Sequence, residues 1–179
     1  MAKNDSVKIS QFDIDSIIKA KKYIDFNGAS WNKKCFNAKD PAWLVLNSAV
    51  LDNDQLAIQN LRIEFTFKPA LCEGLIDKMY FTAIYNSRRI FAVDHGQSLI
   101  HKNKYFDVIP TPPPIVTGTH YHIRHEKYNF ETGYPIENIP KKDENNFSYF
   151  CNEFMIRFNT TAIGVIPHPY NKENEDKLL

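Results

Sequence analysis

The segment from Gly118 to Glu126 carries the residues of this 179-residue chain whose types and spacing are best suited to chemistry. It reads GTHYHIRHE and holds three of the six histidines. In a β-strand, successive side chains point to opposite faces, so every second residue shares a face. One face of this segment then carries a polar row, made up of His120, His122, Arg124 and Glu126. The opposite face carries Tyr121, Ile123 and His125.

The polar row predicts cleavage of a phosphodiester without a metal. RNA hydrolysis through the 2′-hydroxyl needs a base, an acid and a cation beside the developing negative charge. His120 and His122 supply the acid and the base, because an imidazole titrates near neutral pH. Arg124 binds the phosphate. Glu126 orients a histidine or replaces one as the base.

His101 is the auxiliary catalytic group expected beside this row. It lies in a basic stretch with Lys102 and Lys104, ahead of a proline-rich loop at residues 110–114. Proline has no amide proton and cannot continue a sheet, so this loop is expected to be exposed and semi-rigid. It serves as a connector or as a lid that leads the chain into the histidine segment.

The same segment also matches a metal site. Two imidazoles two residues apart on a strand, with a carboxylate four residues further on the same face, can converge on one divalent transition metal ion. The match is His120-x-His122-x-x-x-Glu126, with His168 as a further ligand. This pattern resembles the first motif of the cupin barrels, in which the matching residues bind a catalytic or structural metal. The two alternatives differ in cofactor, which is none for the metal-free enzyme and a divalent metal for the cupin-like protein.

A non-catalytic role is the third alternative. Histidines on a half-exposed strand are often solvated side chains that pair across the sheet. The chain is then an interaction protein, such as an antitoxin-like binder or an inhibitor of host defence. An aromatic content of 13% and a formal net charge of +1 are compatible with such a surface.

A broader pattern surrounds the histidine segment over about residues 88–158. Its parts are Arg89-Ile90-x-x-x-Asp94, His101-x-Asn103, Gly118-Thr119-His120-x-His122, Glu126-x-Tyr128, Tyr134-Pro135 and a Phe-rich helix. The pattern resembles an uncharacterised family of small prokaryotic proteins associated with toxin–antitoxin systems and mobile elements. The resemblance implies a shared constellation of Asp94, His101, Asn103, His120, His122 and Glu126. Together with the metal-free chemistry, it predicts a toxin-like ribonuclease of a prokaryote or phage, with RNA or an antitoxin-like protein as partner.

Hydrophobic periodicity predicts the elements that position these residues. The run from Leu61 to Phe67 alternates strictly and predicts a strand, and residues 79–94 predict a hairpin that turns at 86–88. Helical spacing predicts a short helix from Phe12 to about Ile24 and an amphipathic helix over about 144–158, with Asp143 as its N-cap. The expected fold is α+β, with an antiparallel sheet of about five or six strands covered by the late helix. A cupin-like β-barrel is the alternative.

Composition limits the class of protein. The chain is 43% hydrophobic and 24% charged, which is ordinary for one globular domain and gives no overall sign of a nucleic-acid binder. The three cysteines form no C-x-x-C pair, so neither a disulfide framework nor a cysteine zinc site is indicated. No signal peptide or membrane-spanning run is present, so we expect a cytoplasmic protein with no membrane partner. We expect a single domain over residues 9–170, with a flexible N-terminus at 1–8 and a charged, flexible tail at 171–179.

Overall fold

The computed structural model describes residues 8–33, 43–70, 72 and 74–170 of the chain. The two terminal segments predicted to be flexible lie outside the described residues, apart from Lys8.

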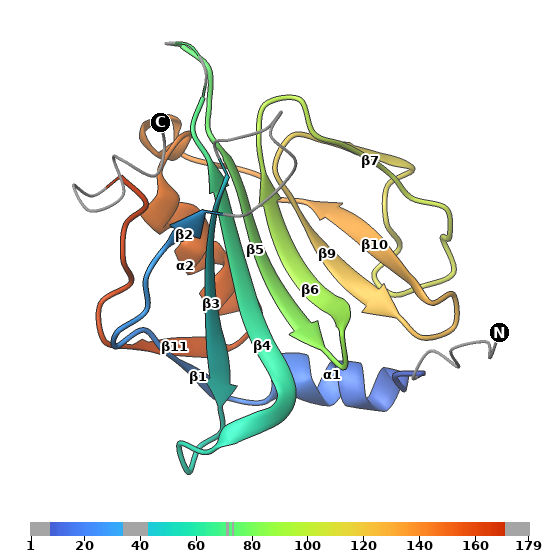
Figure 1. Cartoon of the computed structure of the whole chain (residues 1–179). Helices are drawn as coiled ribbons and strands as arrows, with labels where there is room; N and C mark the ends of the chain where they lie inside the picture. The colour runs from blue at the N-terminus through green and yellow to red at the C-terminus, as the bar shows by residue number, and fades with distance from the viewer. Residues whose placement is uncertain (1–7, 34–42, 71, 73, 171–179) are drawn as a thin grey trace, which may run out of the picture.

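A mixed sheet of nine strands forms the body of the described protein (Figure 1). Eight strands follow one another in the order β10-β9-β6-β5-β4-β3-β1-β11, and β2 also pairs with β3. The parallel pairing is that of β1 with β11, and the other pairs are antiparallel. The strands are β1 Lys22–Asp25, β2 Asn32–Lys33, β3 Leu44–Leu51, β4 Ala57–Lys68, β5 Lys78–Tyr85, β6 Arg88–His95, β9 His120–His125, β10 Phe130–Pro135 and β11 Thr160–Ile163.

The α+β class is confirmed, but the sheet is larger than expected. The prediction of five or six strands is an undercount, because β1, β2 and β11 are only four, two and four residues long. Strands this short show no clear alternation of apolar and polar residues. The cupin-like β-barrel is wrong, because the sheet is open and its outermost strands, β10 and β11, are not paired with each other.

Strands β5 and β6 form the predicted hairpin. Its two-residue turn consists of Asn86 and Ser87, whose φ angles are 46° and 61°. Two consecutive positive φ angles are typical of a type I′ turn, whose twist matches that of the strands it joins. A register shift between Ala83 and Ile84 then moves the pairing by one residue, so that Tyr80 lies directly opposite Asp94.

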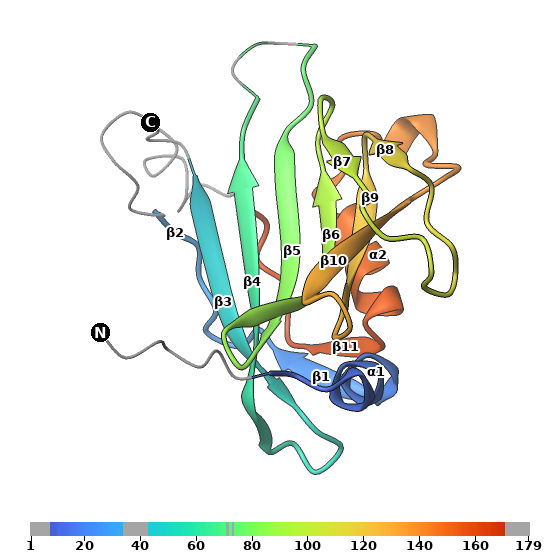
Figure 2. The same cartoon turned by 90° about the vertical axis from the view of Figure 1, so that its right-hand side faces the viewer.

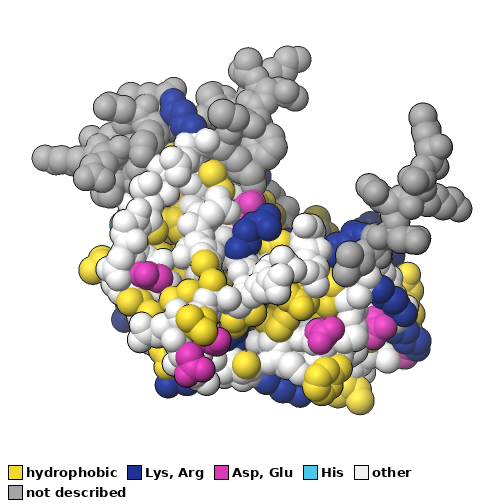
Figure 3. All heavy atoms as spheres, turned by 60° about the horizontal axis from the view of Figure 1, so that its bottom comes forward, with side chains coloured by type: hydrophobic (Ala, Val, Ile, Leu, Met, Phe, Trp, Pro, Cys, Tyr) yellow, Lys and Arg dark blue, Asp and Glu magenta, His cyan; other side chains and the backbone are white. Residues whose placement is uncertain are grey.

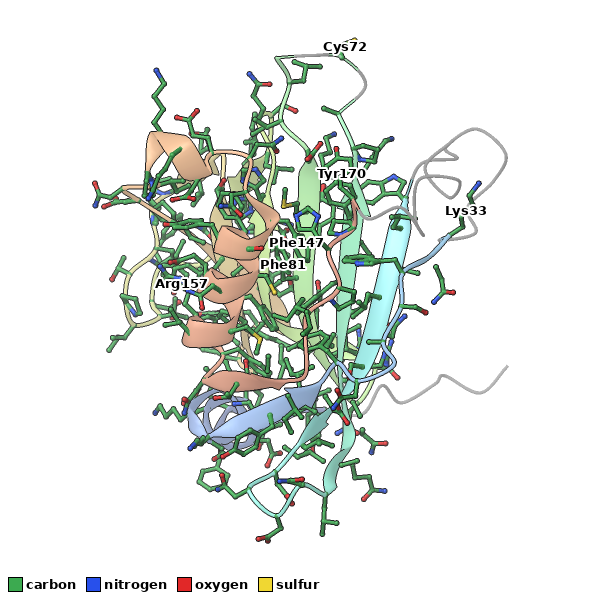
Figure 4. All side chains as sticks on the ribbon, turned by 90° about the vertical axis from the view of Figure 1, so that its left-hand side faces the viewer. Lys33, Cys72, Phe81, Phe147, Arg157 and Tyr170 are labelled. Atoms are coloured by element: carbon green, nitrogen blue, oxygen red, sulfur yellow. The ribbon has the colours of Figure 1, made fainter. Side chains whose placement is uncertain are left out.

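Helix α2, Phe147–Arg157, covers one face of the sheet (Figure 4). The ring of Phe154 packs against Phe65 and Phe81, with centroid distances of 5.3 and 6.4 Å. Figure 4 also shows Phe147 of α2 beside Phe81 of β5, and these rings lie 5.5 Å apart. The predicted amphipathic helix is therefore confirmed, and its phenylalanines form the core of the protein.

The N-terminus of α2 is capped by Asn146. Its side-chain oxygen accepts a hydrogen bond from the backbone N–H of Tyr149 at 3.2 Å, which satisfies one of the amides that a helix end leaves open. The prediction that Asp143 caps this helix is wrong, because Asp143 ends the short 3₁₀ helix Lys141–Asp143 that precedes it.

Helix α1, Gln11–Lys19, is the predicted N-terminal helix, and it ends earlier than expected because the chain enters β1 at Lys22. The buried ammonium group of Lys22 donates to the carbonyls of Ile17 and Ala20, both at 2.5 Å. These contacts satisfy carbonyls at the end of α1. Burial lowers the pKa of Lys22 to about 8. Neither α-helix in the described part of the chain is long and apolar enough to cross a membrane.

A two-stranded ribbon covers the other face of the sheet, beside β9 and β10 (Figure 2). It consists of β7 Ile100–Lys102 and β8 Ile115–Thr117, which pair antiparallel and are joined by the segment that contains the predicted proline-rich loop. Ala92 lies opposite His122, which contacts the ribbon, whereas the neighbouring Phe91 packs against α2. Strand β6 is thus enclosed on both faces along most of its length.

His95, the last residue of β6, lies on the α2 side of the sheet. Its ring stacks on Phe150 with the centroids 3.8 Å apart, and its Nδ1 lies 2.8 Å from the hydroxyl of Thr119. Only 2% of the residue is exposed. Burial lowers the pKa of His95 to about 4.

Protonation of His95 is expected to make the protein less stable in mild acid. Because its pKa is lower in the folded protein than in the unfolded chain, the unfolded chain binds more protons between about pH 6.5 and pH 4. The free energy of unfolding should therefore fall by about 2 kcal/mol from pH 7 to pH 4.5 on account of this group alone. Denaturant unfolding of the wild type and of His95→Gln at both pH values measures the difference. Equal pH dependence in the two proteins would contradict the assignment.

Candidate functional site

The alternation predicted for the histidine segment is confirmed in strand β9. His120, His122 and Arg124 are buried on the side that faces the ribbon, at 3%, 2% and 7% exposure. Cross-strand pairing then determines their neighbours, because His120 lies opposite Asp94 of β6 and His122 lies opposite Gly133 of β10. The strand ends at His125, so Glu126 is not part of it.

His101 reaches the same place from the ribbon. Its ring centroid lies 4.7 Å from that of His122 and 5.8 Å from that of His120, and the last two lie 4.6 Å apart. One ring nitrogen of each histidine lies within 4.8 Å of those of the other two. Three imidazoles from two separate sheets therefore face a common point.

Gly133 makes this approach possible. A Cβ atom at that position would lie 2.6 Å from Cδ2 and 2.9 Å from Cγ of His101, which is closer than such atoms approach in proteins. The ring of His101 occupies the space that any other residue would fill. The absence of a side chain on β10 is thus what lets the ribbon bring its histidine close to His122.

Hydrogen bonds orient two of the three rings. His120 Nδ1 lies 2.6 Å from the carbonyl of Gly118, and His122 Nε2 lies 3.0 Å from Oδ2 of Asp94. A carbonyl and a carboxylate can only accept, so these ring nitrogens carry the protons. When the rings are neutral, the lone pairs lie on Nε2 of His120 and Nδ1 of His122.

Two ring nitrogens in the cluster are buried and have no hydrogen-bond partner among the described residues. They are Nδ1 of His122 and Nε2 of His101. Buried polar groups are nearly always satisfied, and the exceptions in folded proteins often mark ion sites or catalytic sites. Burial lowers the pKa of both His101 and His120, and the neighbouring imidazoles lower it further. Both rings are therefore neutral near pH 7 and have a lone pair to offer.

Arg89 forms ion pairs with two acidic side chains, Glu131 and Asp94, beside the histidines. Nε of Arg89 donates to Glu131 at 2.6 Å, and its Nη1 lies 3.5 Å from Asp94. Burial alone would lower the pKa of Arg89, but its bonds to Glu131 and Asp94 raise it. For Asp94, burial favours the neutral acid, yet the hydrogen bond from His122 and the charge of Arg89 hold its pKa below the usual range. Asp94 is thus a carboxylate that accepts from His122.

The histidine cluster opens into a pocket of about 300 Å³. Its lining comes from β5, β6, β9 and the ribbon, and consists of Tyr80, Arg89, Asp94, Leu99, Ile100, His101, His120 and His122. Tyr80 and Arg89 were not among the candidate site residues drawn from the sequence. The predicted hairpin alone would not have identified Tyr80, because its two-residue turn pairs Tyr80 with Val93, and a register shift along the strands brings Asp94 opposite it instead.

The structure brings Asp94, His101, His120 and His122 together, with Asn103 behind His101. Arg124 lies on the same face, but its guanidinium donates to the backbone carbonyl of Asn129 at 3.2 Å and also to its side chain. Arg124 is not among the residues that line the pocket.

Glu126 and His168 lie away from the cluster. The carboxylate of Glu126 accepts from the backbone N–H of Gln11 at 2.8 Å and pairs with Lys8 at 3.1 Å. This carboxylate holds the start of α1. His168 packs against Phe147, with ring centroids 5.3 Å apart. The ligand set His120, His122, Glu126 and His168 is therefore not assembled.

The chain matches no family model, no curated protein and no solved structure. What defines it is the fold and the site: an α+β protein that gathers two buried imidazoles and one half-buried imidazole on one face of an open sheet.

Replacement of Gly133 by alanine is expected to displace His101. The new Cβ forces the ring of His101 out of its place, at a cost of about 1–3 kcal/mol in the free energy of unfolding, as in other overpacked sites. Denaturant unfolding measures the loss, and a crystal structure of the variant shows the ring. The matched control is Gly96→Ala, where the nearest contact, at 3.3 Å, is the flexible side chain of Leu99. An unmoved ring in Gly133→Ala would refute the packing argument.

Proposed function

We propose that this chain binds one divalent transition metal ion through His101, His120 and His122, and that it is a metal-dependent hydrolytic enzyme. The observation that carries the proposal is the convergence of three imidazoles, of which His101 and His122 each have a buried ring nitrogen without a partner among the described residues. Imidazole nitrogens are the usual ligands of zinc and of its neighbours in the first transition row.

The geometry suits such an ion after a small contraction. Nitrogens bound to a tetrahedral ion at about 2.1 Å lie about 3.4 Å apart, whereas the present separations are at most 4.8 Å. Asp94 behind His122 and the carbonyl of Gly118 behind His120 are typical outer partners of metal-bound histidines, because they orient the ring and increase its basicity. Three protein ligands with an open side are characteristic of catalytic sites.

The pocket supports a hydrolytic role. A divalent ion held this way lowers the pKa of a bound water, which supplies hydroxide at neutral pH. The phenol of Tyr80 and the guanidinium of Arg89 line the same pocket and can donate hydrogen bonds to a substrate. Leu99 and Ile100 give it an apolar wall. The chain itself thus binds and orients the substrate beside the ion.

Metal-free cleavage of RNA by a toxin-like enzyme is the second candidate. The hydrogen-bonded pair of His122 and Asp94 in the same pocket as Arg89 favours it, because a base, an acid and a cation are then together. In this metal-free mechanism, Arg89 binds the phosphate in place of Arg124. Arg89 is, however, already bonded to Glu131, which leaves less of its charge for a phosphate.

The surface gives RNA little additional support. Basic and acidic side chains are interspersed on the face seen in Figure 3, in keeping with a net charge of +1. Proteins that bind nucleic acid usually concentrate basic residues on one face. The toxin-like role and an antitoxin-like partner are supported by the sequence resemblance, and a purely binding role is the third proposal.

Stoichiometric metal is the first test. Untagged protein, dialysed after incubation with Zn²⁺, should hold one ion per chain by elemental analysis. Alanine at His101, His120 or His122 should weaken zinc affinity more than about 100-fold, since each change removes a ligand and exceeds the 10–100-fold cost of losing an outer partner. Glu126→Gln and His168→Gln are matched controls that should keep full stoichiometry. Loss of zinc in these controls, or a wild type without bound metal, would refute the proposal.

Chelation separates the two catalytic candidates. A metal-dependent enzyme loses hydrolysis of RNA or of model esters in a chelator and regains it when Zn²⁺ is restored. A metal-free ribonuclease cleaves RNA equally well in the chelator and loses activity in His122→Ala. We expect the first result, and the same assay with both substrates shows which bond is cleaved.

A further inference from the structure

Exposed apolar side chains are concentrated on the ribbon and on the segment that joins its two strands. Four of the ten large apolar side chains that are exposed in the described part of the chain lie there, namely Ile100, Phe106, Ile109 and Ile115. Single exposed apolar side chains are ordinary on a protein surface, whereas a group of them marks a binding surface. The ribbon is therefore a candidate for recognition of an apolar ligand.

Two of these side chains, Ile100 and Ile115, share the outer face of the ribbon. Ile100 lies opposite Thr117, and Ile115 lies opposite Lys102. Directly opposite residues share a face, and so do residues two apart on one strand. The two isoleucines are therefore diagonal neighbours, at 66% and 54% exposure. The side chain of His101 points the other way, into the histidine cluster.

This outer face continues the wall of the histidine pocket. Ile100 lines the pocket as well as the ribbon surface, and Leu99 beside it supplies the other apolar part of the lining. The rest of the lining carries polar groups. A ligand whose reactive group lies among the histidines can therefore extend an apolar chain past Ile100 toward Ile115 and keep it in apolar contact.

We infer that the substrate is a carboxylic ester with an apolar acyl chain, which lies along the outer face of the ribbon. The inference rests on the proposed function and names the substrate class of the same site. An uncharged ester suits the pocket better than a phosphate, because the charge of Arg89 is already balanced by Glu131 and Asp94. In the reaction, the oxygen of water bonds to the acyl carbon, the bond from that carbon to the alcohol oxygen breaks, and a proton of the water passes to the departing alcohol.

The size of the outer face favours an acyl chain over a protein partner. A stable protein interface buries about 800 Å² on each partner, or roughly 20–30 residues, whereas the outer ribbon face offers two isoleucines. Two such side chains suffice for several methylenes, and removal of one methylene from water strengthens binding about threefold to fourfold. Chain length is therefore the property that this face should select.

Hydrolysis of p-nitrophenyl acetate, butyrate and octanoate by the zinc-loaded protein measures this selection. kcat/KM should rise about threefold to fourfold for each added methylene until the chain passes Ile115. Ile115→Ser should reduce the octanoate-to-acetate ratio of kcat/KM about tenfold, because the end of the chain loses its contact. Ile156→Ser is the matched control and should leave the ratio unchanged, since Ile156 is also 66% exposed but lies on α2.

Methyl NMR of the metal-free protein tests the same face without catalysis. Titration with sodium octanoate should shift the methyl signals of Ile100 and Ile115 but not that of Ile156, and sodium acetate should shift none of them. A flat dependence of kcat/KM on chain length in a protein that binds zinc and cleaves the acetate would overturn the inference, as would unmoved signals of Ile100 and Ile115 in octanoate. Octanoate binding at these isoleucines by a protein that binds no zinc and cleaves no ester would refute the proposed function and leave the binding of an apolar chain by the ribbon standing.

Discussion

The antiparallel pairing of β6 with β9 is the constraint on which the rest of the site depends. It aligns Asp94 with His120 and Ala92 with His122, so a carboxylate and two imidazoles share one face of the sheet. On the opposite face, Phe91 of β6 packs against Phe154 of α2 and against Phe158, and Tyr121 of β9 packs against Phe91. Because side chains alternate, a register slip of one residue would turn the histidines into that apolar core. The packing of α2 therefore keeps the polar row on the ribbon side.

Burial of so many polar groups requires that each be satisfied. The ion pairs of Arg89 and Arg124 with Asp94 and Glu131 balance charge, and backbone groups take up further donors. The unpartnered nitrogens of His101 and His122 are exceptions among the described residues, as are Oδ1 of Asp94 and Nε2 of His95 and His125. An unsatisfied buried group costs about 1–3 kcal/mol, and an ion bound by the nitrogens of His101 and His122 would remove that cost for both. Under this proposal the metal stabilises the attachment of the ribbon as well as serving chemistry.

The H-x-N spacing acquires a physical meaning in this arrangement. His101 and Asn103 are two residues apart, so both side chains point from the ribbon toward β10. There the ring of His101 lies over Gly133, and the side-chain amide of Asn103 forms hydrogen bonds with the backbone of Gly133. Glycine at position 133 serves both contacts. The histidine pair on β9 and the H-x-N pair on the ribbon thus form a single unit with a glycine between them.

The local pattern of apolar and polar residues was sufficient to predict the longer strands, the late helix and the residues on one face of the site. Alternation in β9 identified His120 and His122, and the spacing of phenylalanines identified α2 and the core. Strands of two to four residues were missed, because they are too short for a period to show. The resemblance pointed to Asp94, His101 and Asn103, but their contacts were not visible in the sequence.

Tertiary structure alone decided which candidates meet. Glu126 follows the last residue of β9 and holds α1, Arg124 is bonded to Asn129, and His168 packs on α2, so none of them joins the cluster. Tyr80 and Arg89 enter through strand pairing. The sequence by itself determined which side chains share a face, because that follows from the period of a strand. The partners across that face depend on the register of distant strands and on a space left at Gly133, which only the folded chain establishes.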